Sequence, residues 1–166
     1  MSENIDSEYI NAIFENVRKD TSLLANMDIE EILKNVEKNS YLENKSLDDL
    51  LEEKMTTLNT LRISKEQKKE LCDKLVDYRF VHNIYEIHKG KHIRWIRKDE
   101  KSLILKNGSP VSDIIFSDNG TNIQCRGYQG RIFQIKWDNC LIFQKLSIGE
   151  QLVLMIHEHI VKTTNK

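Results

Sequence analysis

The decapeptide Lys89-Gly90-Lys91-His92-Ile93-Arg94-Trp95-Ile96-Arg97-Lys98 marks the point at which the pattern of the chain changes. Before it, apolar residues recur every three or four positions, as in amphipathic helices; after it they alternate with polar residues, as in half-buried strands. All six glycines and the single proline lie at or after Gly90, so the first 89 residues contain neither breaker. The sequence therefore predicts an α+β fold: a helical N-terminal half, a small antiparallel β-barrel or bent sheet, and a C-terminal helix.

Net charge changes sign near the same place. Residues 1–77 contain 11 Lys/Arg and 18 Asp/Glu, giving −7, whereas residues 78–166 contain 14 and 8, giving +6. From these shifts we expect three regions. They are an acidic helical region over 1–63, a long connecting helix over 64–89, and a small basic antiparallel β-domain with a closing helix over 90–166.

Capping-box patterns predict where several helices begin. The paired residues are Asp28 with Glu31, Ser46 with Asp49, Ser64 with Gln67, and Ser147 with Glu150, and a further helix is expected after Asp6 or Ser7. The helix after Ser64 is expected to be the longest, because apolar residues from Leu71 to Ile87 keep helical spacing until Gly90.

Six short strands are expected after Gly90, separated by turns rich in Gly, Asn and Asp. Their ranges are 91–98, 102–107, 111–117, 121–128, 130–137 and 140–146. A closed barrel would remove the exposed edges of such a sheet, whereas a bent sheet would keep them.

Strand alternation places a set of mostly basic and amide side chains on the outer face of this sheet. The candidate site residues are Lys91, His92, Arg94, Arg97, Gln124, Arg126, Gln134 and Lys136, and Gln144 is expected on the same face. Such a surface suits phosphate groups or a partner protein. Two alternatives stay open: the outside of a barrel is polar in any case, and the basic run 89–98 pairs in part with the acidic helices.

The sequence contains no catalytic or metal-binding signature. His157 and His159 are two residues apart and so do not share a helix face, and there is no Cys-x-x-Cys pair or glycine-rich phosphate loop. We therefore expect no catalytic residues, metal or cofactor. The odd number of widely spaced cysteines, three, is typical of reduced thiols rather than a disulfide framework.

Two segments resemble short uncharacterised proteins of nucleocytoplasmic large DNA viruses, of the mimivirus and phycodnavirus kind. They are residues 78–96, from Tyr78-Arg79-Phe80-Val81 to Arg94-Trp95-Ile96, and Leu141-Ile142-Phe143-Gln144-Lys145-Leu146-Ser147. The resemblance covers roughly the second half of the chain and implies no activity or site residue. It implies an intracellular protein, in the cytoplasm or nucleus of a host or in a virion. An acidic, polar N-terminus and the lack of a long apolar run agree with this, and predict no secretion and no membrane.

We therefore expect a non-enzymatic binding or scaffolding module that engages a protein partner, or a second copy of itself, through the β-domain. Nucleic acid is the other ligand that its positive charge allows. Two alternatives belong to other classes. One is an enzyme with a dispersed site, using residues such as His82, Glu86, His88 and Arg94 in a cleft between the halves. The other is a structural virion component.

Overall fold

The computed structural model describes residue 42, residues 45–147 and, near the C-terminus, residues 149–151, 154, 157, 158 and 165. The chain divides into two compact units. Asp48–Leu146 forms one, and Met1–Leu47 with Ser147–Lys166 forms the other. The helices expected near Asp6 and Asp28 lie outside the described residues. Within the described part of the chain, no helix is long and apolar enough to cross a membrane.

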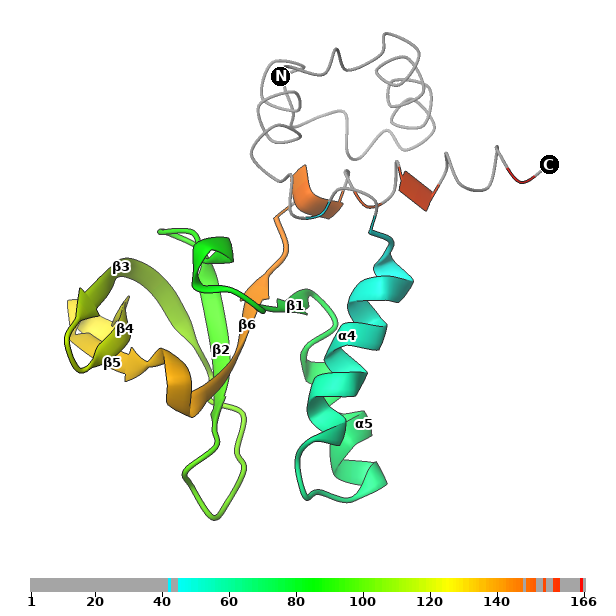
Figure 1. Ribbon diagram of the computed structural model, residues 1–166, viewed down its shortest axis with the longest axis horizontal. Helices are drawn as coiled ribbons and strands as arrows, with labels where there is room; N and C mark the ends of the chain where they lie inside the picture. Colours follow the sequence, from blue (N-terminus) through cyan, green and yellow to red (C-terminus); the bar gives the residue numbers. More distant parts are fainter. Residues whose placement is uncertain are drawn as a thin grey trace, which may run out of the picture. The chain divides into compact units, whose positions relative to one another are not determined.

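Two helices precede the sheet, α4 (Leu47–Asn59) and α5 (Lys65–Lys74) (Figure 1). The predicted capping box begins α5. Ser64 Oγ accepts a hydrogen bond from the Gln67 amide at 3.2 Å, and Gln67 Oε1 accepts one from the Ser64 amide at 2.9 Å. Both amides would otherwise lack a partner in the first turn, so the box determines where this helix starts.

The continuous helix predicted over 64–89 is wrong. After α5 ends at Lys74, the chain forms strand β1 (Tyr78–Phe80) and a single 3-10 turn, η2 (Ile84–Glu86). β1 pairs with β6 (Cys140–Lys145), far along the sequence, with Arg79 opposite Gln144. This long-range pairing outweighs the local helical spacing, which is only a weak determinant of structure.

Six antiparallel strands form one sheet in the order β1-β6-β2-β3-β4-β5. The other strands are β2 (His92–Arg97), β3 (Ser109–Ser117), β4 (Gly120–Arg126) and β5 (Ile132–Lys136). Five predicted strands are confirmed. The predicted strand over 102–107 is not formed, and this segment makes a single bridge, between Leu105 and Ile96.

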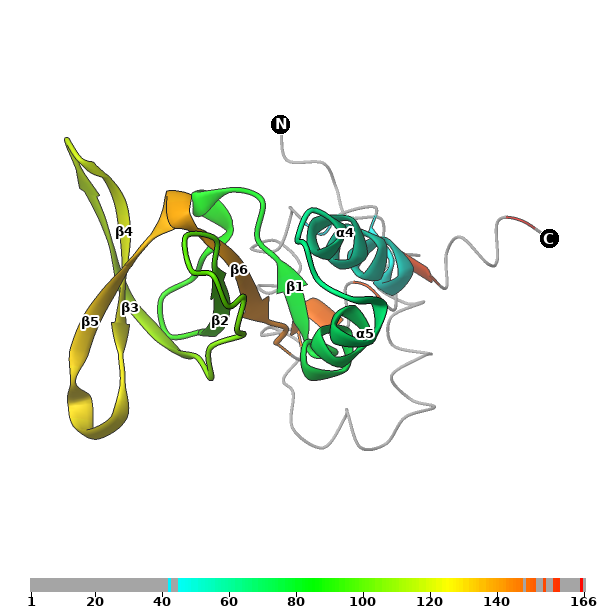
Figure 2. The same cartoon turned by 90° about the horizontal axis from the view of Figure 1, so that it is seen from below.

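The sheet bends along β3. The start of β3 pairs with β2 and the rest pairs with β4, and the register shifts between Val111 and Asp113. Such a bulge increases the local twist and bends a strand. Figure 2 shows β3, β4 and β5 turned away from β2 and β6. The sheet stays open, with β1 and β5 as its edges, so the predicted bend is present and the closed barrel is not.

The half of the sheet made by β2 and β6 is buried on both faces. On one face, Ile93 and Ile142 pack with apolar residues of β3, β4 and β5. On the other face, Ile96 and Phe143 pack with Leu58 of α4 and with residues of α5. Because the helices cover this second face, the outward-facing part of the sheet lies in β4 and β5.

The capping box predicted at Ser147 is also present, in the other unit. Ser147 Oγ accepts from the Glu150 amide, and Glu150 Oε1 accepts from the Ser147 amide, each at 3.2 Å. The described residues that follow, 149–151, 154, 157 and 158, are helical.

Candidate binding surface

The eight predicted site residues divide between the two halves of the bent sheet. Lys91, His92, Arg94 and Arg97 belong to β2 or the residue before it, and Gln124, Arg126, Gln134 and Lys136 belong to β4 and β5. The two groups have different surroundings, so the single cationic face expected from alternation is not present as one surface.

Arg94 contributes to the architecture of the molecule. Its Nε donates to the Lys106 carbonyl at 3.0 Å, and one terminal nitrogen donates to the Lys74 carbonyl, at the end of α5, at 3.2 Å. A cation is favourable there because the carboxyl end of a helix carries unpaired carbonyls and a partial negative charge. The expected outward position of Arg94 is therefore wrong, since α5 packs on that side of β2.

Gln144 is also buried, with 0% of its surface exposed, which corrects its expected place on the outer face. Its amide side chain accepts from the His88 amide at 2.9 Å and donates to the Glu86 carbonyl at 3.2 Å. The same Glu86 residue binds Arg79 through both its carboxylate, at 2.7 Å, and its carbonyl, at 2.8 Å. These contacts tie η2 to β1 and β6.

Lys91 and His92 are partly removed from water. Burial, with a smaller contribution from the Arg79 charge, lowers the pKa of Lys91 to about 8. Burial also lowers the pKa of His92, and the nearby Lys145 and Arg94 charges act in the same direction. His92 Nδ1 lies 2.9 Å from the Tyr78 hydroxyl. The lowered pKa of His92 and its contact with Tyr78 make this residue a poor phosphate ligand.

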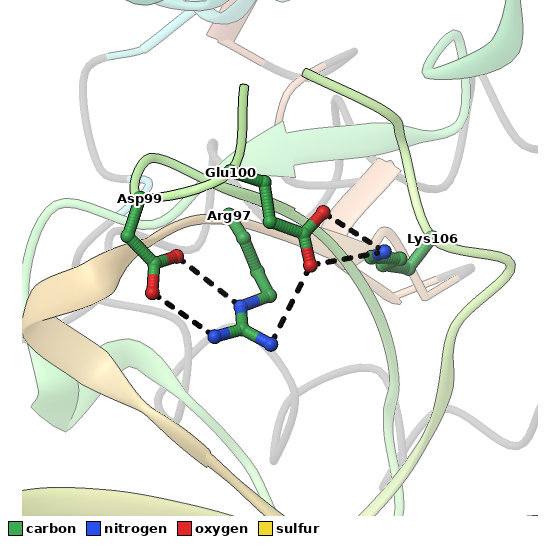
Figure 3. Close-up of polar contacts among 4 residues, drawn as sticks. All are labelled: Arg97, Asp99, Glu100 and Lys106. Atoms are coloured by element: carbon green, nitrogen blue, oxygen red, sulfur yellow. Dashed lines mark hydrogen bonds and ion pairs between the residues drawn. The ribbon is translucent and has the colours of Figure 1, made fainter. Parts of the chain in front are cut away.

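Arg97 lies at the exposed end of β2 within a network of four charges (Figure 3). Its guanidinium forms two hydrogen bonds with Asp99, at 3.0 and 3.2 Å, and reaches Glu100 at 3.4 Å, while Lys106 binds Glu100 at 3.1 Å. The hydrogen bond from Arg97 is the main reason that the pKa of Asp99 is lowered. Two acids therefore neutralise Arg97 and Lys106.

The outer side chains of β4 and β5 form a continuous surface, as alternation predicted. We name Gln124, Arg126, Ile132, Gln134 and Lys136 the β4–β5 surface. Gln124 lies opposite Gln134, and Arg126 lies opposite Ile132. Ile132 is 56% exposed, and Arg126, Gln134 and Lys136 are exposed as well. Gln124 is half-buried and donates to Ser112 Oγ at 3.2 Å.

A pocket of about 320 Å³ adjoins this surface. Its lining consists of Arg97, Asp99, Gln134, Ile135, Lys136, Asn139 and Cys140. It brings together one predicted site residue of β2 and two of β5. Asn139, in the 3-10 turn η4 (Trp137–Asn139), was not predicted, because the turn was read only as a connection between strands. Cys140 begins β6 and was read only as a reduced thiol.

The residues weighed for an enzyme site have separate contacts. His82 pairs with Glu53 of α4 at 3.1 Å, Glu86 binds Arg79, and Arg94 binds carbonyls. All three cysteines are free thiols. In the described ranges, no three His, Cys, Asp or Glu side chains lie close enough together to hold a metal ion.

No protein-family model matches the chain, and the comparisons with curated proteins and with solved structures give no match either.

Proposed function

We propose that this protein is a non-enzymatic binding module and that the β4–β5 surface engages a protein partner. One observation carries the proposal. An exposed isoleucine and two exposed cations lie together on the half of the sheet that α4 and α5 leave uncovered. An apolar side chain among polar ones on an open face is typical of the surfaces that proteins use for recognition.

The state of the basic residues favours protein over nucleic acid. Residues 78–146 carry 12 Lys/Arg and 6 Asp/Glu, giving +6. Yet Arg94 binds carbonyls, and Arg97 and Lys106 are paired with acids. A nucleic-acid surface needs a long row of free cations along the path of the phosphates, and these paired residues do not extend the exposed cations of β4 and β5 into such a row. We also propose a viral origin and an intracellular location, on the resemblance and the sequence described above.

Oligonucleotide binding separates the two ligand classes. Fluorescence anisotropy with labelled single- and double-stranded DNA and RNA, at about 50 and 200 mM salt, is expected to show weak binding to all four probes. Tight binding that weakens roughly a hundredfold across this salt range would indicate about four phosphate contacts and would contradict the proposal.

Selection from a displayed library of random short peptides tests the surface directly. We expect peptides enriched on the full-length protein to lose affinity at least tenfold when Arg126, Ile132 and Lys136 are all changed to threonine, because threonine keeps the strands but removes the charges and the apolar contact. The control is Val76→Thr with Tyr85→Thr, two exposed residues outside β4 and β5. Peptides that bind both variants like the unchanged protein would place recognition elsewhere.

A further inference from the structure

β5 forms one edge of the open sheet, and half of its backbone polar groups point away from β4. The hairpin that joins β4 and β5 determines which residues of β5 direct their backbone groups toward β4 and which direct them away from it. The Gly127 amide donates to the Arg131 carbonyl at 2.7 Å, so this pair is hydrogen-bonded. Bonded and non-bonded pairs alternate in antiparallel strands, and the register places Arg126 opposite Ile132 in the next, non-bonded pair. The N–H groups of Ile132, Gln134 and Lys136 and the C=O groups of Ile132 and Gln134 therefore point to the open edge, whereas the Lys136 carbonyl belongs to the first turn of η4.

These outward groups have no backbone partner in the part of the chain that the structure describes. Unpaired edge groups are the template on which an extended peptide adds as a further strand. The other edge, β1, is only three residues long and offers less backbone for such pairing.

The pocket extends the edge into a site with room for a side chain. Gln134, Ile135 and Lys136, the last three residues of β5, line it together with Arg97 and Asp99. A strand laid along β5 would direct alternate side chains to each face of the sheet, so that some of them lie beside the pocket. One of them would enter the pocket while the backbone pairs with Gln134.

The charges around β5 indicate the character of the added segment. Arg126, Arg131 and Lys136 are exposed, and none of the three forms an ion pair with another described residue. An acidic segment would complement them, and opposite charges across paired strands stabilise the pairing. A second copy of β5 would instead bring the same cations to the same edge, which is unfavourable.

We propose that β5 binds an extended, acidic segment of a protein partner by strand addition, with backbone hydrogen bonds to Ile132, Gln134 and Lys136. This inference rests on the proposed function and specifies its mode of recognition. The peptides enriched from the displayed library are then expected to be rich in Asp and Glu. Enrichment of neutral or basic peptides would overturn the acidic assignment.

The variant Gln134→Pro tests strand addition. Proline removes one outward N–H and blocks close approach, yet is tolerated on an edge strand where its nitrogen faces away from the neighbouring strand. We expect peptide affinity to fall at least tenfold. The matched variant Gln134→Val removes the same side chain and keeps the N–H, so we expect it to lose at least about threefold less affinity than Gln134→Pro. Equal loss in both variants would show that the side chain, and not the backbone, binds the peptide.

A second measurement does not depend on how the proline variant folds. Each backbone nitrogen of an enriched peptide is methylated in turn, and binding to the unchanged full-length protein is measured by anisotropy. Strand addition predicts loss at every second position, because only alternate amides face β5. Loss without this period overturns strand addition. The proposed function survives that result if the threonine variant still abolishes binding, and fails if it does not.

Light scattering after size-exclusion chromatography tests whether a second copy of the protein, rather than a partner segment, occupies the β5 edge. We expect the same mass for the unchanged protein and for Gln134→Pro. A dimer that Gln134→Pro converts to a monomer would assign the edge to a second copy and overturn the proposal.

Discussion

Replacing Glu86 by alanine is expected to lower the free energy of unfolding by about 3 kcal/mol, because it removes the carboxylate that faces a buried arginine. Arg79 is only 2% exposed and Glu86 is 17% exposed, and their charged atoms are 2.7 Å apart. Removal of one member leaves a charged group in a poorly solvated site, which costs far more than loss of a surface ion pair.

The control for this prediction is Glu86→Gln, which keeps a hydrogen-bond acceptor for Arg79 and the backbone carbonyl that Arg79 and Gln144 share. We expect it to cost about half as much. Urea or thermal unfolding gives both values, and a loss of about 3 kcal/mol corresponds to roughly 6 to 12 °C in Tm for a chain of this size. Substitutions of exposed residues usually change the free energy of unfolding by no more than about 0.5 kcal/mol. If Glu86→Ala changes it by no more than this, the buried network does not stabilise β1 as described.

Gly108→Ala is the second substitution with a large expected effect, also about 3 kcal/mol. Gly108 precedes β3 and has a φ of +94°, a conformation that favours glycine. A Cβ at this position would collide with the Ile93 carbonyl oxygen and lie 2.5 Å from His92 Cε1. The histidine ring has some freedom to move, but the carbonyl belongs to β2, whose Ile93 pairs with both β3 and β6.

Gly90→Ala is the matched control, since Gly90 has a similar φ of +88° and open space where a Cβ would lie. It is expected to cost about 1 kcal/mol, which is the conformational penalty alone. The difference between the two variants in urea unfolding measures the collision with β2. Equal costs would show that the chain before β3 does not approach β2 as closely as the structure has it.

Local signals in the sequence were sufficient for several elements. The capping boxes at Ser64 and Ser147 are present because their partners lie within one turn of helix. The outward polar residues of β4 and β5 were found from alternation alone, because one face of these strands is buried and the other is exposed, whereas the exposed Ile132 was not identified.

Features that depend on distant segments were not found in this way. Residues 75–89 have helical spacing, yet β1 forms because β6, which is far along the sequence, lies next to it in the sheet. The position of Arg94 was misjudged because nothing near it indicates that α5 packs on that side. A signal was available in Leu141-Ile142-Phe143, a continuous apolar run of the kind expected in a strand buried on both faces.

The candidate site was partly predictable, because strand alternation identifies exposed residues but does not give the strand order. Gln134, Lys136 and Arg97 were identified as exposed polar residues, and the structure gathers them around one pocket. The open edge of β5 was not identified, because strand order depends on the whole sheet and closure into a barrel was an equally good expectation.

Native-state amide hydrogen exchange along β5 tests the central claim most directly. In the free full-length protein, the amides of Ile132, Gln134 and Lys136 are expected to exchange rapidly because they face the open edge. Those of Phe133 and Ile135 are expected to be protected because they face β4. Equal protection at all five positions would show that another segment already occupies this edge, and would contradict a binding surface built on β5.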